Sequence, residues 1–224
     1  MMTSIQFLLL AAIPILFAIT LHEVAHGFVA KLRGDNTAKM MGRLSLNPIK
    51  HIDILGTIIV PALLFLTGGF IFGWAKPVPV NESQLKNPRY DSALVALAGP
   101  CANFLMAIFW AIIAKLALFL GQSAPEAATI FFYMGFLGIY FNILLMVLNL
   151  VPIPPLDGSR IISAFLPLSA AISYNRIERF GFLILLALII IPIGGRPLLW
   201  YIIGPFINFF NVLILSIFNL PQVM

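Results

Sequence analysis

Apolar residues fill most of the chain and fall into six long runs separated by short polar connectors. The runs cover roughly 4–30, 54–73, 93–120, 128–151, 180–193 and 198–219. A helix of about 20 apolar residues crosses a bilayer, and four of the six runs reach that length easily. The other two are less regular, because glycines and a proline interrupt 54–73 and because 180–193 is short. The pattern predicts an all-α polytopic membrane protein with about five to six transmembrane helices.

The composition indicates one membrane domain and argues against other classes of protein. Hydrophobic residues make up 61% of the chain and charged residues 9%, which no water-soluble domain of this length shows. The connectors are too short for a soluble domain, so we expect a single domain over 1–224, with a core at about 4–166 and additional helices at about 177–219. The net charge of +5 is spread through the connectors, which does not favour nucleic-acid binding. The single cysteine, Cys101, excludes an intramolecular disulfide and is expected to be a small core residue.

The positions of the basic residues favour one of two topologies. Lysines and arginines crowd three connectors, at 31–50, 76–89 and 160–179. If 54–73 crossed the bilayer completely, these connectors would lie on both sides, against the tendency of basic residues to stay in the cytoplasm. If 54–73 enters and returns, all three connectors lie inside and the N-terminus lies outside. We therefore expect a re-entrant 54–73, which is allowed where protein or a water-filled cavity covers the backbone.

The first apolar run contains a specific motif, His22-Glu23-Val24-Ala25-His26. Only three histidines occur in the chain, and two of them lie in this box. Residues i and i+4 share one face of a helix, so both imidazoles can reach one metal ion. Glu23 is placed to accept a proton from a water that the metal activates. A buried, hydrogen-bonded histidine pair without a metal is the alternative.

A catalytic zinc site needs a third protein ligand. The candidates are one histidine, the cysteine and the acidic residues: His51, Cys101, Asp35, Asp53, Glu82, Asp91, Glu126, Asp157 and Glu178. Asp157 stands out because three prolines end the fourth run just before it, and such a break turns a side chain inward. In the re-entrant topology Asp157 lies near the depth of His26, which is about 8–14 Å from the cytoplasmic end of its helix. A helix cap or a partner for Arg160 is the alternative role of Asp157.

Three motifs occur in a fixed order along the chain: His22-Glu23-Val24-Ala25-His26, Ala98-Gly99-Pro100-Cys101-Ala102-Asn103, and the stretch from Asn149 to Gly158. In this order and spacing they resemble the site-2 protease family of intramembrane zinc metalloproteases. The stretches 42–48 and 73–81 are similar to the short bacterial and archaeal branch of that family. The likeness covers about residues 15–165.

The resemblance implies the chemistry of the site. His22, His26 and Asp157 would bind one zinc ion, and Glu23 would be the general base. Asn149 would steady the oxyanion or orient the substrate, with an interhelical hydrogen bond as the alternative.

The resemblance also implies a class of substrate, because the family cleaves transmembrane segments. We therefore expect a zinc metalloendopeptidase in the cell membrane, acting on transmembrane protein substrates, with its active site in the cytoplasmic half of the bilayer. Asn103 is a candidate for substrate binding, with close helix packing as the alternative. Short β-strand-like loops at 42–47 and 76–81 would hold an unwound substrate by edge pairing. A non-catalytic membrane protein of the same fold and a metal transporter are the alternative functions.

Overall fold

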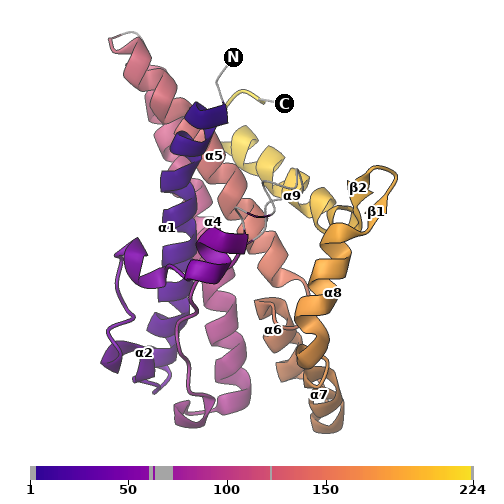
Figure 1. Ribbon diagram of the computed structural model, residues 1–224. Coiled ribbons are helices and arrows are strands. Elements are labelled where there is room, and N and C mark those ends of the chain that lie inside the picture. The colour runs from indigo at the N-terminus through magenta and orange to yellow at the C-terminus, as the bar shows by residue number, and fades with distance from the viewer. Residues whose placement is uncertain (1–3, 61–62, 64–72, 122, 223–224) are drawn as a thin grey trace.

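The computed structural model describes residues 4–60, 63, 73–121 and 123–222, and helices dominate that part of the chain (Figure 1). Four helices are long and apolar enough to cross a membrane: α1 (Ser4–Leu32), α4 (Pro88–Leu120), α5 (Pro125–Leu150) and α9 (Leu198–Ile217). A further helix, α8 (Glu178–Ile190), has 13 residues and is shorter than a typical crossing. The predicted all-α polytopic class is confirmed, with four such helices in the described residues where about five to six were expected.

Shorter elements occupy the connectors. They are α2 (Thr37–Met40), η1 (Pro48–His51), η2 (Ile54–Ile59), η3 (Glu82–Gln84), α6 (Asp157–Phe165), α7 (Leu168–Asn175), β1 (Pro192–Ile193) and β2 (Arg196–Pro197). Prolines set several of the boundaries, because Pro88 and Pro125 stand in the first turns of α4 and α5, where no backbone N–H is needed. The proline-rich stretch after Leu150 cannot continue α5, so the chain turns there and α6 begins at Asp157.

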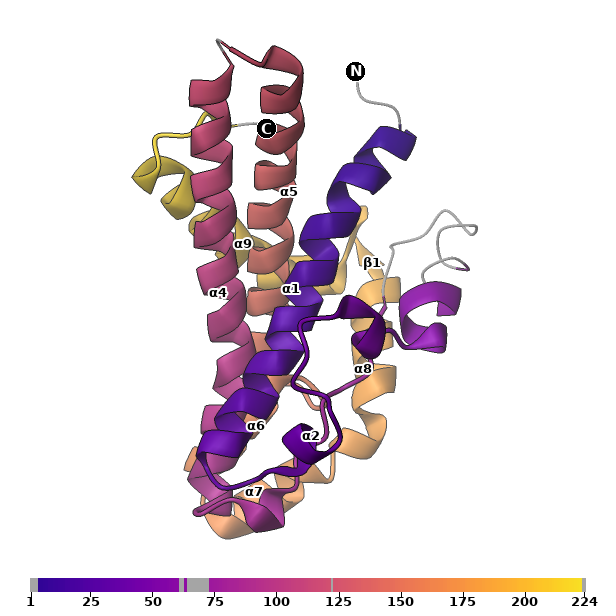
Figure 2. The ribbon, with the colours of Figure 1, turned by 90° about the vertical axis from the view of Figure 1, so that its left-hand side faces the viewer.

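The core is the contact between α4 and α5, and α1 packs against both helices (Figures 1 and 2). Small residues allow the two backbones to approach closely, as in other membrane helix pairs. A Cβ added at Gly138 would lie 2.2 Å from the Trp110 ring, and one at Gly135 would lie 2.6 Å from Ala114. These glycines therefore fix the distance between α4 and α5, and with it the frame on which the polar residues of α1 and α4 are placed.

Three side-chain contacts bring the basic connectors to the same end of the helices. The Arg33 guanidinium, just after α1, lies 2.6 Å from Asp91 in the first turn of α4. Arg160 on α6 lies 3.4 Å from Glu82, and Arg89 donates to the carbonyl at the end of α6. The chain therefore leaves α1 and enters α4 at one end, as the re-entrant topology requires. Of segment 54–73, positions 61–62 and 64–72 lie outside the described residues.

The strand-like loops expected near the motif residues are not strands. The two-stranded hairpin β1–β2 is the sheet found in the described part of the chain, and 42–47 and 76–81 are irregular. Their backbone groups bind mainly side chains and no neighbouring strand: Asn81 N–H donates to Asp35, and the carbonyls of Lys76 and Pro77 accept from Arg43. Lys76 N–H has a backbone partner, because it donates to His51 O. Proline at 77 and 79 also removes N–H groups that a ladder would need.

Candidate metal centre

Three predicted ligand atoms converge at the contact of α1 with α4 and the start of α6. The Nε2 atoms of His22 and His26 lie 3.0 Å apart. Asp157 Oδ2 lies 3.2 Å from His22 Nε2 and 3.4 Å from His26 Nε2. Among the described residues, these three form the one group of His, Cys, Asp or Glu side chains that lie close enough to hold a metal ion. The histidines come together because they are one helical turn apart, and Asp157 arrives from about 130 positions away.

Hydrogen bonds on the far side of each ring fix which nitrogen faces the centre. His26 Nδ1 lies 2.7 Å from Val95 O, which can only accept, so Nδ1–H is the donor. His22 Nδ1 donates in the same way to Asn103 Oδ1 at 2.6 Å. The amide of Asn103 is oriented in turn, because its Nδ2 donates to Ala18 O and to Asn142 Oδ1. In the neutral imidazoles both Nε2 atoms therefore carry lone pairs, and these lone pairs point at each other and at a carboxylate.

This arrangement fits a zinc ion. Atoms bonded to zinc at about 2.0–2.2 Å in a tetrahedral site lie about 3.4 Å from one another, close to the three separations observed. Asp157 Oδ2 is buried and has no hydrogen-bond partner among the described residues. Three converging acceptors repel each other unless a cation lies between them. The donor set of two imidazoles and one carboxylate is typical of catalytic zinc sites, which leave a position open for water or substrate.

A comparison with known protein families places the chain in a group of peptidases. The model of "Peptidase family M50" matches residues 10–127 and 113–192, which include all three ligands. The chain belongs to peptidase family M50. This family is that of the site-2 proteases, so the resemblance seen in the three motifs is confirmed.

Curated relatives in the M50 family have similar names and cover most of this chain. The chain is 38% identical over 208 residues to "Putative zinc metalloprotease YwhC" of Bacillus subtilis (strain 168), covering 92% of this chain and 90% of the relative. It is 32% identical over 183 residues to "Putative zinc metalloprotease Rip2" of Mycolicibacterium smegmatis, covering 81% of this chain and 66% of the relative. No solved structure matches the chain.

The three candidate ligands line a cavity of about 240 Å³ that Glu23 and Asn149 also line. Glu23 is partly buried, and its Oε2 accepts the backbone N–H of Val78 at 2.7 Å. Val78 lies between two prolines, so its N–H is the donor that the stretch 77–79 can offer. The carboxylate of Glu23 is thus held at the edge of the cavity by the segment that follows 54–73.

Asn149 and Asn103, the two asparagines predicted for the site, occupy different positions in it. Asn149 lines the cavity, and its Nδ2 donates to Leu145 O one turn earlier on the same helix at 3.0 Å. Asn103 is completely buried behind His22, where it orients the imidazole. The structure therefore places Asn103 next to a ligand and away from the open cavity, while its part in substrate binding stays a prediction.

The remaining candidates for the third ligand lie elsewhere. His51 is buried, and its Nε2 donates to Ser45 O at 2.8 Å. Cys101 is exposed on α4, so the expectation of a small core residue is wrong. Pro100 and Asn103 take buried positions of that turn. Arg160 forms its ion pair with Glu82. The alternative role of Asp157, a partner for Arg160, is therefore not the one seen in the structure.

Three contributors to the site were not predicted. Val78 offers its backbone N–H to Glu23, Asn142 supports Asn103, and Gly99 gives space to both imidazoles. The sequence does contain a sign that Asn142 has a function, because it is a polar residue in the middle of an otherwise apolar run. A backbone N–H leaves no trace in a sequence, so the contact of Val78 had no such signal.

Proposed function

We propose that the chain is an intramembrane zinc metalloendopeptidase that hydrolyses peptide bonds within or next to transmembrane segments of other membrane proteins. One observation carries the proposal: His22, His26 and Asp157 converge beside Glu23 on a helix that is long and apolar enough to cross a bilayer. Polar groups at such a position are costly and need a function. The names of the curated relatives support zinc chemistry and proteolysis.

The chemistry divides between the ion and the residues that surround it. A zinc ion held by His22, His26 and Asp157 would polarise a scissile carbonyl and lower the pKa of a water to about 7. Glu23 takes a proton from the attacking water and later delivers it to the leaving amine. Val78 N–H occupies Oε2 of Glu23, so we assign the transferred proton to Oε1.

Asn149 and the segment 76–81 would position the substrate. One hydrogen of the Asn149 amide is used within its own helix, so the other can donate to the oxyanion that forms at the scissile carbonyl. A transmembrane helix must unwind before its peptide bonds can be attacked, and the segment 76–81 borders the cavity where the unwound strand would lie.

The active site would face the cytoplasm of a multi-pass cell-membrane protein. The basic connectors, tied to one another at the α2–α6–α7 end, support this orientation through the tendency of lysines and arginines to remain inside. A reporter tag inserted at 82–86 should be found inside the cell. A tag found outside would refute the orientation.

The test of the proposal is Glu23→Gln in the purified protein. The variant should keep its zinc, because the ligands are unchanged, and should lose at least about 100-fold of the cleavage rate of a model transmembrane peptide. Glu126→Gln, an exposed acid at the start of α5, is the matched control and should cleave normally. Equal cleavage by Glu23→Gln and wild type would refute the protease and favour another function for the ion.

A further inference from the structure

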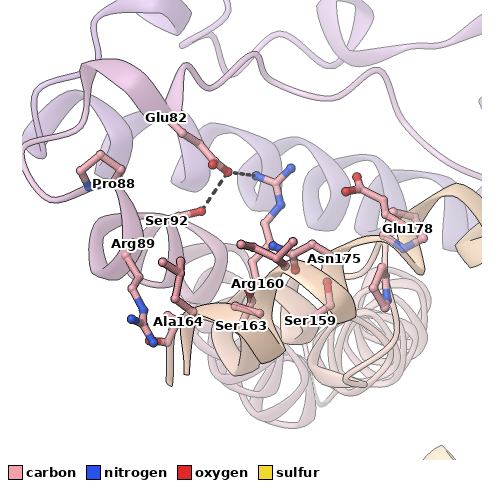
Figure 3. A pocket seen from close by; sticks show the side chains of 15 residues that line it. Glu82, Pro88, Arg89, Ser92, Ser159, Arg160, Ser163, Ala164, Asn175 and Glu178 are labelled. Atoms are coloured by element: carbon pink, nitrogen blue, oxygen red, sulfur yellow. Dashed lines mark hydrogen bonds and ion pairs between the residues drawn. The ribbon is translucent and has the colours of Figure 1, made fainter. Parts of the chain in front are cut away.

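A second cavity of about 380 Å³, lined by both polar and apolar side chains, lies beside the catalytic one. The two cavities share Pro155 and Arg160 in their linings. Figure 3 shows polar side chains from the loop before α4, from α6 and from α8 directed into this space, while buried Pro154, Ala164 and Ala171 give it an apolar floor. A chain segment leaving the catalytic cavity at this end of the molecule would enter the second cavity next.

An ion pair stands between the two cavities. Glu82 accepts from Ser92 Oγ at 3.0 Å and from Arg160 Nη1 at 3.4 Å. The side chains of Glu82 and Arg160 are 53% and 47% exposed. An ion pair this long and this exposed stabilises little, so a competing cation can replace Arg160 on Glu82 at small cost.

The cavity is lined by two carboxylates, Glu82 and Glu178, and by two guanidiniums, Arg89 and Arg160. Arg89 is committed to the backbone carbonyls of Ala164 and Leu166, where it completes the end of α6. Figure 3 shows the Glu178 carboxylate directed toward the Arg160 guanidinium from the side opposite Glu82. Glu178 has no ion pair within 4 Å in the described part of the chain. Two carboxylates from separate elements thus face a single, half-exposed guanidinium.

We propose that this second cavity binds the basic residues that flank a substrate's transmembrane segment, with a substrate Lys or Arg replacing Arg160 on Glu82. The inference rests on the proposed protease function and specifies its substrate class. Basic residues concentrate where transmembrane segments meet the cytoplasm, and their aliphatic stems would cover the apolar floor. Because Arg160 also lines the catalytic cavity, its release from Glu82 links occupancy of the flank site to the space around the scissile bond.

Binding without cleavage tests this proposal. Three model transmembrane peptides that differ only in two flanking residues, Lys-Lys, Gln-Gln or Glu-Glu, are titrated into the Glu23→Gln protein in uncharged detergent. The Lys-Lys peptide should bind about tenfold more tightly than the Gln-Gln peptide, the size expected of a charge-assisted contact. Adding Glu82→Gln or Glu178→Gln should reduce the preference to about threefold or less, and Glu82→Lys should favour the Glu-Glu peptide. Adding Glu126→Gln should change nothing.

Equal affinity for all three peptides, or an unchanged preference in both Glu82→Gln and Glu178→Gln, would overturn the flank site. Zinc content measured on each variant separates lost binding from lost folding. The wild-type protein is then given the same peptides. Cleavage of all three with one efficiency would support the protease and overturn the flank site. Cleavage of none would overturn the proposed function, and the flank site with it.

Discussion

Gly99 lies directly against His26 at the contact of α4 with α1. A Cβ at position 99 would lie 2.5 Å from His26 Nε2 and also 2.5 Å from His22 Cε1. Both ligands can reach a common point because the side chain of residue 99 is absent. This explains the Gly-Pro pair of the second motif by its contact with the metal ligands as well as by helix packing.

Gly99→Ala should therefore lose metal before it loses its fold. The methyl group displaces both imidazoles, and we expect zinc affinity to fall on the order of 100-fold, at the upper end of the effect of altering a ligand's support. Zinc per chain after dialysis against a weak chelator measures this. Gly121→Ala at the other end of α4 is the matched control, since its Cβ would meet one carbonyl at 3.4 Å. Full zinc content in Gly99→Ala would contradict the account.

Asn142→Ala should weaken zinc binding, although Asn142 acts only through Asn103. Asn142 is completely buried, holds Asn103 at 3.0 Å, and contacts no ligand itself. Without it the Asn103 amide can rotate and stop accepting from His22, so zinc affinity should fall about tenfold. The competition of the protein with a zinc indicator dye measures the change.

Asn211→Ala is the control for Asn142→Ala. Asn211 donates to a carbonyl of its own helix, as Asn142 does, but it lies on α9. It should bind zinc like the wild type. Equal zinc affinity in both variants would show that Asn142 serves packing alone.

Val78→Pro should reduce cleavage and spare the metal. The substitution removes the N–H that holds Glu23, a charge-assisted hydrogen bond, and the rate should fall about 10–100-fold. Val78→Ala keeps the N–H and is the control. The readouts are the cleavage rate of a transmembrane peptide and the zinc content of each variant. Similar cleavage rates in Val78→Pro and Val78→Ala would show that the Val78 N–H does not support catalysis.

Asp35→Asn should loosen the segment that carries Val78. Asp35 is completely buried and accepts from Thr37 N–H at 2.8 Å and Asn81 N–H at 2.7 Å. An Asn side chain can accept one of these bonds but would turn N–H groups toward the other, so we expect a destabilisation of about 1–3 kcal/mol. Limited proteolysis should cut the variant faster within 76–87, and an unchanged cutting rate would contradict this role.

The pH dependence of the same contact has a definite sign. Burial alone would raise the pKa of Asp35, but the hydrogen bonds from Thr37 and Asn81 outweigh it and hold the pKa below its ordinary value. A carboxylate with a lowered pKa stabilises the fold above its unfolded-state pKa of about 3.9. That contribution is lost as the pH falls through the lower folded value. Wild-type protection of 76–87 should thus persist at pH 5 and weaken below about pH 4.

The parts of the site that follow local rules could be predicted from the sequence. His22 and His26 are one turn apart on a single helix, so their spacing in the sequence predicts that they share a face. Prolines interrupt a regular helix in any context, so the prolines before Asp157 predict the end of the helix. The re-entrant topology was inferred from charge alone, because a charge bias acts on whole connectors, and it stays a prediction. The contact of Arg33 with Asp91 agrees with that topology.

The parts that depend on packing between distant segments could not be predicted. Gly99 matters because α4 packs against α1 at the level of His22 and His26. The sequence of either helix alone does not specify which residues meet at that level. The strand-like appearance of 76–81 was misleading for a similar reason. Its hydrogen-bonding groups are taken by Glu23, Asp35 and Arg43, side chains that reach the segment only in the folded protein.

The central claim is that His22, His26 and Asp157 hold one zinc ion, and zinc X-ray absorption of the purified protein tests it most directly. We predict one zinc per chain with nitrogen and oxygen neighbours at about 2.0–2.2 Å, and loss of the metal in His26→Ala. No zinc, or a sulfur neighbour at about 2.3 Å, which Cys101 as the single cysteine of the chain would supply, would contradict the account.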